Sequence, residues 1–462
     1  MYANVIIEYG VKALNKTFIY RIPDELKDKI KVGMKVYVPF GTQQVLGFVI
    51  ELQNSNDTGF DAKEIIKIDN TELVLNKELM DVGAYLSKIT LCSLITAYQT
   101  MLPSSLKIKK QEHNYNLYDE YLVLTDKLKA MEYICKYPRR IAQIKTINNI
   151  LEEGKLNKKE VSSEIFKALE ENGIVSIEKV SKYRINNDNI NVIKKTLTKE
   201  QESIYKSLDF KKHDTYLLYG VTGSGKTEIY IKWIEKCIRD GKTAIMLVPE
   251  IGLTTQIAKR FYESFGSDVA IFHSSLSEGE KYDEYLKILR GEVHVVVGTR
   301  SAVFVPLKNL GIIIIDEEDS SSYKQDNNPR YHARDIAIYR GKYNNIPVIL
   351  GSATPTLESK ARADKGVYKL LRLRNRVGNA KLPFIHVIDM ESEMKKRNMI
   401  FSDFLQDKIK EKLARKEQII LLLNRRGFST YITCSNCGYT YKCPNCDITL
   451  TYHKTTNNLV CH

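Results

Sequence analysis

Short apolar runs separated by helical patterns dominate the chain from Leu197 onward. Strands of a parallel sheet that is covered on both faces have continuous apolar sequences, whereas half-exposed strands alternate apolar and polar residues. Six such runs are present, at Tyr216–Tyr219, Thr243–Val248, Val269–Phe272, His294–Val297, Gly311–Ile315 and Val348–Leu350. The pattern predicts a doubly wound α/β domain with parallel strands and helices on both faces.

The first 105 residues follow a different pattern, in which short strands are punctuated by Gly33 and Gly41. The predicted strands are Thr17–Ile22, Lys35–Phe40 and Val45–Leu52. Residues 77–102 are predicted to form one or two helices that end before Pro103. We therefore expect a small β-rich domain over residues 1–105.

A third pattern occupies residues 110–190. Ile141–Glu153 and Asn157–Asn172 are predicted helices, and Gly173–Ile177 turns into a strand. Two short helices followed by a hairpin that begins at glycine are typical of a winged helix-turn-helix, a module that docks nucleic acid or protein. An ordinary helical linker domain fits the pattern equally well. The polar stretch 186–195 is expected to link this region to the α/β domain.

One motif of the α/β domain has a direct chemical meaning. Gly220–Thr227 fits the phosphate-binding pattern G-x-x-x-x-G-K-T and lies between a predicted strand and a predicted helix over Thr227–Arg239. Its glycines let the backbone turn N–H groups towards phosphate, Lys226 reaches the β- and γ-phosphate oxygens, and Thr227 can bind Mg²⁺. The helix N-terminus adds a favourable dipole. The expected nucleotide-binding residues are Gly220, Val221, Thr222, Gly223, Ser224, Gly225, Lys226 and Thr227.

A second nucleotide element ends the apolar strand that precedes Asp316. Asp316 is placed to hold Mg²⁺ through water, and Glu317 is placed to polarise the attacking water. An acidic strand end without a chemical role is the alternative. Ser352 and Thr354, which end the next strand, can sense the acidic cluster and relay the nucleotide state. Gln201 precedes the loop by about twenty residues and either reads the adenine edge or simply starts a helix.

Composition narrows the class of protein and of partner. Of the 462 residues 43% are hydrophobic, which is typical of a globular protein, and no apolar run approaches the ~18 residues of a membrane span. The amino terminus has no basic stretch and carries an acid within its apolar run, so we expect no signal peptide and a cytoplasmic location. A net charge of +14 favours a polyanionic partner, although a lysine-rich composition bias is a serious alternative.

These motifs, in this order, resemble those of superfamily 2 helicases, as do Leu247–Thr254 and Val297–Ala302. Ser321–Gln325, Arg330–Asp335 and Leu422–Gly427 are similar to segments of the PriA family of primosomal replication-restart helicases (primosomal protein N′), and the resemblance covers essentially the whole chain. It implies a multidomain α/β protein. The implied domains are a 3′-end DNA-binding domain (1–105), a winged helix (110–190), a RecA-like ATP-binding lobe (197–375), the start of a second lobe (376–433) and a partial zinc-binding insertion (434–462).

The resemblance also implies residues that contact DNA. Phe18, Gly41 and Lys63 match the pocket that holds a 3′ end, whereas Ile19 stands where the family often has Asp. Tyr323, Tyr331 and His332 fall in an aromatic-rich loop and are expected to stack on bases; packing under the acidic strand is the alternative. Asp319 stands where the family has His at the fourth position of the acidic box.

The implied activity is ATP-dependent 3′-to-5′ DNA unwinding during replication restart at stalled or branched forks, with reloading of the replicative helicase. The implied partners are forked and single-stranded DNA, single-stranded DNA-binding protein and the primosome or helicase-loading proteins. Binding to a membrane is not expected. ATP, Mg²⁺ and Zn²⁺ are the implied cofactors. The implied location is the bacterial cytoplasm, in association with the nucleoid.

Five of the eight cysteines fall within the last 29 residues, at Cys434, Cys437, Cys443, Cys446 and Cys461. Paired C-x-x-C motifs in an intracellular chain indicate zinc before they indicate disulfides. The resemblance implies two zinc ions and eight cysteines in this insertion, so five cysteines are expected to complete one site at most. We therefore expect an N-terminal piece of a longer helicase. The alternative to an active helicase is a fork-DNA and ATP-binding fragment without catalysis, because the arginine expected from the second lobe is missing.

Overall fold

The structure, a computed structural model, describes residues 1–56, 61–69, 75–107, 117–185, 196–249, 251–379, 383–395, 400–422, 439–453 and 457–461. Two compact units, residues 1–381 and 382–462, are described separately. In the described ranges no helix is both long and apolar enough for a membrane span. Short 3₁₀ helices occur at Lys12–Leu14, Asp24–Leu26, Lys158–Glu160, Gly266–Asp268, Arg300–Phe304, Ser321–Tyr323 and Val377–Asn379.

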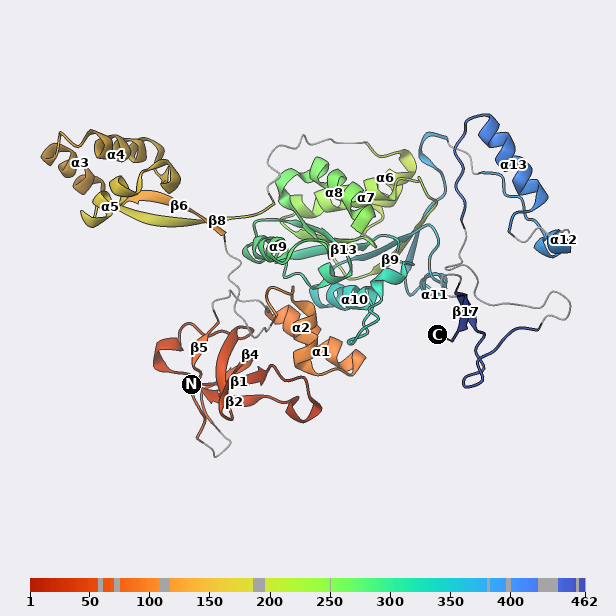
Figure 1. Ribbon diagram of the computed structural model, residues 1–462, viewed down its shortest axis with the longest axis horizontal. Helices are drawn as coiled ribbons and strands as arrows, with labels where there is room; N and C mark the ends of the chain where they lie inside the picture. The colour runs from red at the N-terminus through yellow and green to blue at the C-terminus, as the bar shows by residue number, and fades with distance from the viewer. Residues whose placement is uncertain are drawn as a thin grey trace. The chain divides into compact units, whose positions relative to one another are not determined.

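The N-terminal region is an antiparallel five-stranded sheet followed by two helices, as expected (Figure 1). Its sheet has the order β2-β1-β4-β3-β5, and α1 and α2 pack on its Ile6 and Phe48 face. The other face closes a separate core around Val5, Tyr20 and Val36. The elements are β1 (Tyr2–Ile7), β2 (Phe18–Arg21), β3 (Lys35–Phe40), β4 (Gln43–Gln53), β5 (Lys67–Ile68), α1 (Lys77–Thr90) and α2 (Leu94–Met101).

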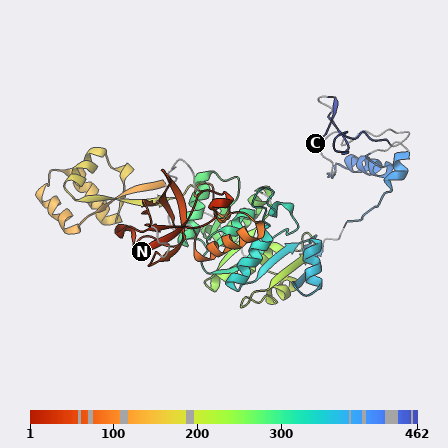
Figure 2. The same cartoon turned by 90° about the horizontal axis from the view of Figure 1, so that it is seen from below.

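The next region is a small antiparallel sheet, β7-β6-β8, covered by three helices that are coloured gold in Figure 2. Its elements are β6 (Leu117–Leu124), α3 (Lys127–Lys136), α4 (Ile141–Glu153), β7 (Leu156–Asn157), α5 (Ser163–Glu171) and β8 (Val175–Lys182). The predicted helix over Asn157–Asn172 is wrong in its first third. Asn157 pairs with Tyr121 in the sheet and Lys158–Glu160 form a 3₁₀ helix. Helix α5 begins only after Ser162, whose hydroxyl accepts a hydrogen bond from the Ile165 N–H.

The α/β domain contains a seven-stranded sheet in the order β11-β12-β10-β13-β14-β9-β15, in which every neighbouring pair is parallel. Its strands are β9 (Thr215–Gly220), β10 (Thr243–Leu247), β11 (Val269–Phe272), β12 (Val295–Gly298), β13 (Leu310–Ile315), β14 (Val348–Ser352) and β15 (Lys369–Leu373). Its helices are α6 (Lys199–Lys206), α7 (Lys226–Arg239), α8 (Ile251–Phe265), α9 (Glu278–Arg290), α10 (Ala333–Asn344) and α11 (Leu357–Asp364).

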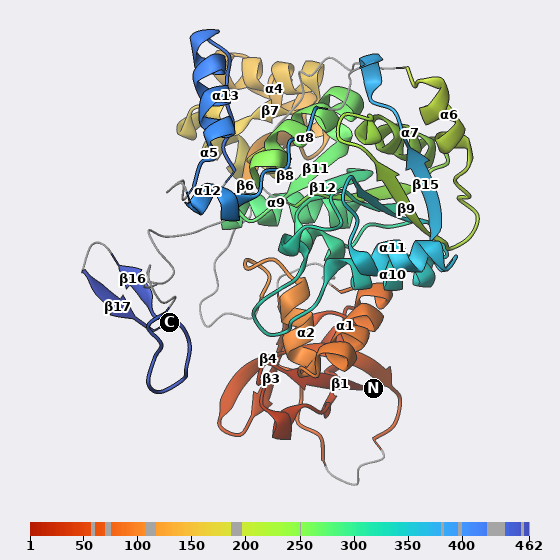
Figure 3. The same ribbon diagram turned by 90° about the vertical axis from the view of Figure 1, so that its right-hand side faces the viewer.

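Both faces of this sheet are buried, which explains its continuous apolar strands. Alternate residues of one strand point to opposite faces, so Ile313 belongs to one core and Ile312 and Ile314 belong to the other. Helices α6, α7 and α8 cover one face, and α9 and α10 cover the opposite face (Figure 3). The predicted doubly wound fold is confirmed. The structure adds β15 as an edge strand, which no continuous apolar run had indicated.

The second unit contributes two helices and one hairpin within its described residues. These are α12 (Met390–Lys395), α13 (Asp403–Ala414), β16 (Thr451–His453) and β17 (Asn458–Val460), with β16 and β17 antiparallel. The segment Leu422–Gly427, which contributed to the family resemblance, lies largely outside the described residues.

Candidate functional site

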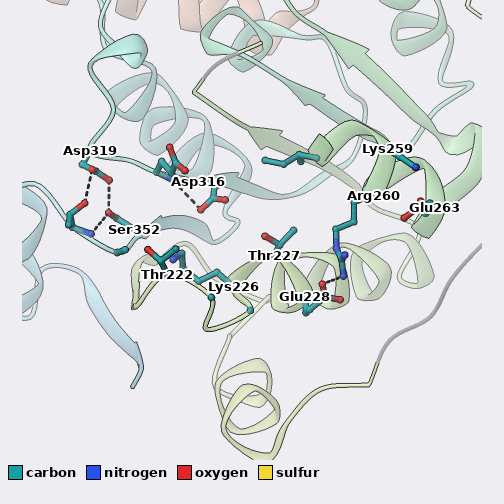
Figure 4. A pocket seen from close by; sticks show the side chains of 16 residues that line it. Thr222, Lys226, Thr227, Glu228, Lys259, Arg260, Glu263, Asp316, Asp319 and Ser352 are labelled. Carbon is teal, nitrogen blue, oxygen red and sulfur yellow. Dashed lines mark hydrogen bonds and ion pairs between the residues drawn. The ribbon is translucent and has the colours of Figure 1, made fainter. Parts of the chain in front are cut away.

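The sheet order brings three distant loops to one place. Strands β13, β14 and β9 are neighbours, so the chain segments that follow their carboxyl ends meet at one edge of the sheet. These segments carry the acidic residues, the Ser352–Thr354 turn and the phosphate-binding loop. Together with α8 they line a cavity of about 780 Å³, shown in Figure 4.

The glycine-rich loop has the backbone that its sequence requires. Gly223 and Gly225 have φ angles of +80° and +79°, a region that L-residues with a side chain rarely adopt. A Cβ atom on Gly225 would also overlap the side-chain amide of Gln201. Helix α7 begins at Lys226, directly behind the loop, so its N-terminal N–H groups and its dipole face the cavity.

Gln201 is buried and supports the phosphate-binding loop from behind. Its Nε2 donates a hydrogen bond to the Ser224 carbonyl at 2.9 Å, and its Oε1 accepts one from the Thr198 N–H at 2.9 Å. The Thr198 hydroxyl in turn accepts a hydrogen bond from the Gln201 N–H, which completes a capping box at the start of α6. The interpretation that Gln201 starts a helix is confirmed, and its recognition of adenine stays a prediction.

We expect Gln201→Ala to weaken binding of a fluorescent ATP analogue about two- to tenfold, because one buried hydrogen bond to the loop contributes ~0.5–1.5 kcal/mol. Thr198→Ala is the matched control, since it breaks the capping box without removing the contact to Ser224. An equal loss in both variants would assign the effect to the helix start rather than to the loop.

Lys226 and Asp316 face each other across the mouth of the loop. Lys226 Nζ donates to the Gly220 carbonyl at 2.8 Å; burial lowers the pKa of Lys226, and the neighbouring carboxylates act in the opposite direction. Burial raises the pKa of Asp316, which Lys226 and a hydrogen bond from the Tyr230 hydroxyl counteract. A buried carboxylate beside the Thr227 hydroxyl provides the oxygen ligands that Mg²⁺ prefers. The two residues therefore fit the predicted Mg²⁺ site.

Asp319 connects the acidic residues to the turn after β14. Its carboxylate accepts hydrogen bonds from the Ser352 hydroxyl and, at 3.0 Å, from the Thr354 hydroxyl. The Ser352 hydroxyl also accepts from the Thr354 N–H at 2.8 Å. Ser352 and Thr354 thus contact the acidic box directly, as the coupling prediction requires, and they do so through the residue that departs from the family pattern.

The two central glutamates of the box occupy different environments. Glu317 has a φ angle of +48° and an exposed side chain at the cavity, where it can reach a water molecule. Glu318 is buried and accepts hydrogen bonds from the Thr356 N–H at 2.8 Å and the Ser359 hydroxyl at 2.9 Å, with Arg334 Nη1 at 3.3 Å. This arrangement assigns Glu318 to the framework and leaves Glu317 as the candidate catalytic carboxylate.

Sequence reasoning missed the α8 side of the cavity. Lys259, Arg260 and Glu263 line it, and Arg260 forms an ion pair with Glu228 of α7 (Figure 4). The cavity therefore contains basic side chains other than that of Lys226. The only available signal was helical spacing after the Leu247–Thr254 motif, which does not indicate towards which neighbour the helix turns its basic residues.

The aromatic loop lies against the acidic strand in this structure. The rings of Tyr323 and Tyr331 are fully buried, and the Tyr323 hydroxyl donates to the Asp316 carbonyl at 2.6 Å. His332 caps α10, where its Nδ1 accepts from the Arg334 N–H. This conformation matches the alternative of packing under the acidic strand. Base stacking by Tyr323, Tyr331 and His332 stays a prediction, and it would require the loop to move.

The three residues of the predicted 3′-end pocket lie together in the N-terminal sheet. Gly41 forms the turn between β3 and β4, and its carbonyl accepts a hydrogen bond from Lys63 Nζ at 3.4 Å. Phe18 meets Phe40, the residue before Gly41, edge to face at 5.3 Å between ring centroids. Two aromatic rings beside an exposed lysine form a surface on which a base and a phosphate can be held.

A second cationic surface lies between the end of α2 and the loops of the α/β domain. This groove has a volume of about 1050 Å³ and is lined by Lys107, Lys281, Arg300 and Lys324, and among the described residues Asp326 is the one acidic residue in its lining. Arg300 and Lys324 donate to backbone carbonyls, at 2.7 Å to Lys324 O and 2.8 Å to Arg330 O. Positive charge with few neutralising carboxylates is typical of a phosphodiester-binding surface.

The predicted recognition of nucleic acid by a winged helix receives less support. The second helix of the helix-turn-helix, α5, carries Glu164, Glu170 and Glu171 against one lysine. Such a helix would meet the phosphates of a DNA groove with like charge. Docking of nucleic acid or protein by a winged helix stays a prediction.

Three cysteines converge in the second unit. The sulfur atoms of Cys443, Cys446 and Cys461 lie within 4.8 Å of one another, and the backbone N–H groups of Asn445 and Cys446 lower the pKa of Cys443. This arrangement fits three corners of a tetrahedral zinc site. Cys461 therefore joins the second C-x-x-C pair rather than standing alone. Cys434 and Cys437 lie outside the described residues.

Three parts of the chain match known protein families. Residues 4–103 match a 3′ DNA-binding domain of PriA, residues 198–362 match the DEAD/DEAH box helicases, and residues 443–462 match the cysteine-rich region of the PriA DNA helicase.

Similar proteins cover the whole chain. It is 40% identical to the replication restart protein PriA of Bacillus subtilis and 36% identical to that of Chlamydia muridarum, with 100% of this chain aligned in both cases. The chain spans 67% and 63% of the lengths of these relatives. Among solved structures, RecG bound to a three-way DNA junction is 24% identical over 41% of this chain and 25% of RecG, with a TM-score of 0.32.

Proposed function

The chain belongs to the PriA family of replication restart proteins, and on that premise we propose that it acts as an ATP-dependent 3′-to-5′ DNA helicase of replication restart. It recognises stalled or branched forks through a free 3′ end and helps to reload the replicative helicase. Because the chain spans only about two thirds of its relatives, these activities are proposed for the protein to which these residues belong.

One observation carries this proposal. The phosphate-binding loop, Asp316 and the Ser352–Thr354 turn share one cavity, and the same unit of the chain carries the Phe18, Gly41 and Lys63 surface. A nucleotide site supplies the energy of hydrolysis, and the aromatic and basic surface supplies recognition of a DNA end.

The residues of the cavity divide the chemistry between them. The loop N–H groups and Lys226 hold the β- and γ-phosphates, while Thr227 and Asp316 are placed to hold Mg²⁺, which neutralises charge on the phosphates when it is bound. Glu317 accepts a proton from the attacking water. When the γ-phosphate is lost, Asp319 relays the altered nucleotide state to Ser352 and Thr354 through the hydrogen bonds that join these three residues.

The proposed partners follow from the remaining surfaces. Forked and single-stranded DNA bind the 3′-end surface and the cationic groove, and the acidic α5 region is suited to protein contacts within a primosome. Single-stranded DNA-binding protein and helicase-loading proteins are the proposed protein partners, and the proposed location is the bacterial nucleoid. Zn²⁺ held by Cys443, Cys446 and Cys461 would stabilise the fold of the insertion.

Branched DNA with a free 3′ hydroxyl should bind more tightly than the same DNA with a 3′ phosphate. A phosphate on the terminal hydroxyl adds bulk and negative charge where the surface of Phe18 and Lys63 is proposed to hold the terminal nucleotide, and it would displace the base and ribose from the ring. We expect a loss of about tenfold, and binding to both DNAs should weaken steeply with salt. Fluorescence anisotropy of labelled forks is the measurement. Equal affinity for free and blocked ends would show that these residues do not hold a 3′ end.

A further inference from the structure

A fully buried arginine joins the N-terminal region to the helicase domain. Arg340 of α10 has no exposed surface, and its Nε donates to Glu78 Oε1 of α1 at 2.7 Å. Its Nη1 donates to the carbonyls of Val303 and Val305 at 2.6 and 3.1 Å. Asn344, one turn further along α10, donates to the same Glu78 oxygen at 2.8 Å. One carboxylate of the N-terminal region therefore holds two consecutive turns of the helicase helix.

Aromatic contacts extend this junction along both helices. Tyr85 of α1 stacks on Tyr339 of α10, with 4.0 Å between ring centroids and 12° between ring planes. Glu78 and Tyr85 are seven residues apart and so lie on one face of α1. Figures 1 and 3 show α1, in orange, along α10, in teal. We call the contacts of Glu78, Tyr85, Tyr339, Arg340 and Asn344 the α1–α10 seam.

The seam joins the region that carries the 3′-end surface to the domain that carries one wall of the cationic groove. Helices α1 and α2 pack on the Ile6 and Phe48 face of the N-terminal sheet, and the end of α2 forms one wall of the cationic groove. The opposite wall, with Arg300 and Lys324, belongs to the helicase domain. A shift of α1 along α10 would therefore move the two walls of the groove relative to each other, and it would carry the N-terminal sheet with the α2 wall.

Helix α10 also reaches the acidic box. Arg334, in its first turn, donates to the buried Glu318, and the helix spans 12 residues, or about 18 Å, to Asn344. The acidic box, α10 and the N-terminal helices are thus joined by a continuous series of side-chain contacts.

We propose that the α1–α10 seam is a positioning device that sets the register between the 3′-end surface and the cationic groove, with Glu78 and Arg340 as the positioning residues. This inference rests on the proposed function, because it takes both surfaces as DNA sites. Directional hydrogen bonds from a buried ion pair fix one register between two helices, which apolar contacts alone do not. With a fixed register, binding of the 3′ end places the adjoining strand in the groove at high effective concentration.

The test separates register from stability with a paired substitution. Glu78→Gln/Arg340→Met removes both charges and keeps similar volumes, a change that is often neutral for folding. Tyr85→Ala removes the stacked ring of the seam, and Tyr118→Ala, on the exposed face of β6, is the matched tyrosine control. Each variant is titrated, in the full 462-residue chain, against a fork with a free 3′ end, the same fork with a 3′ phosphate, and a short single strand with a free 3′ end.

We expect the seam variants to bind the short strand and an ATP analogue as the wild type does, while their preference for the fork over the short strand falls about tenfold. If the seam only stabilised the fold, its variants would lose affinity for the fork, the short strand and the ATP analogue together. Wild-type preference in both seam variants would overturn the positioning role. If the wild type itself does not distinguish free from blocked ends, the 3′-end assignment fails, and the role of the seam fails with it.

Discussion

Lys226→Ala should lower the affinity for ATP·Mg²⁺ by about 10- to 150-fold. The lysine is held at the loop by the Gly220 carbonyl and faces Asp316 across the cavity, and a charge-assisted contact of this kind contributes roughly 1.5–3 kcal/mol. The loss should fall at the lower end of this range if Lys259 and Arg260, which line the same cavity, compensate for part of the charge.

Titration with a fluorescent ATP analogue measures this loss. Lys232→Ala is the matched control, because Lys232 belongs to the same helix but pairs with Glu235 and does not line the cavity. Unchanged affinity in Lys226→Ala would rule out the loop as the phosphate site.

Arg340→Met alone should destabilise the protein by about 3–5 kcal/mol. The substitution leaves the Glu78 carboxylate buried without its cation, and removal of one member of a buried ion pair costs more than replacement of both. The Val303 and Val305 carbonyls lose their donors as well. The double variant Glu78→Gln/Arg340→Met should regain a large part of the lost stability.

The chain has one tryptophan, Trp233, which is buried in the helicase domain. Urea unfolding followed by its fluorescence therefore reports on the domain that holds Arg340. An Arg340→Met midpoint equal to that of the wild type would show that the buried ion pair contributes nothing to the stability of this domain.

The helicase sheet was predictable because its strands are buried on both faces and therefore have an unambiguous sequence pattern. The edge strand β15 is only partly buried and carries Lys369 and Arg372 on opposite faces, so the same reasoning missed it. The helix expected from Asn157 fails for a different reason. Asn157 pairs with Tyr121 of β6, and this strand contact with a distant segment overrides the local helical pattern at the start of the predicted helix.

The nucleotide residues were predictable for a similar reason, since their motifs are local and each follows one strand. Contacts between distant segments were not. Nothing near Glu78 indicates a partner 262 residues away, and nothing near Tyr323 indicates that its hydroxyl reaches the Asp316 carbonyl instead of leaving the ring open to a base. Asp319 likewise required the structure, because its role depends on two hydroxyl groups from β14 and the turn after it.

The central claim is that one unit of this chain binds ATP and a DNA end together. The most direct measurement is a titration of the wild-type chain with a fluorescent ATP analogue and Mg²⁺ in the presence of a saturating fork with a free 3′ end, with the DNA anisotropy followed in the same sample. We expect one nucleotide bound per chain while the fork stays bound, and loss of the nucleotide signal alone in Lys226→Ala. Failure of the DNA-bound chain to take up nucleotide, or an equal nucleotide signal in Lys226→Ala, would contradict it.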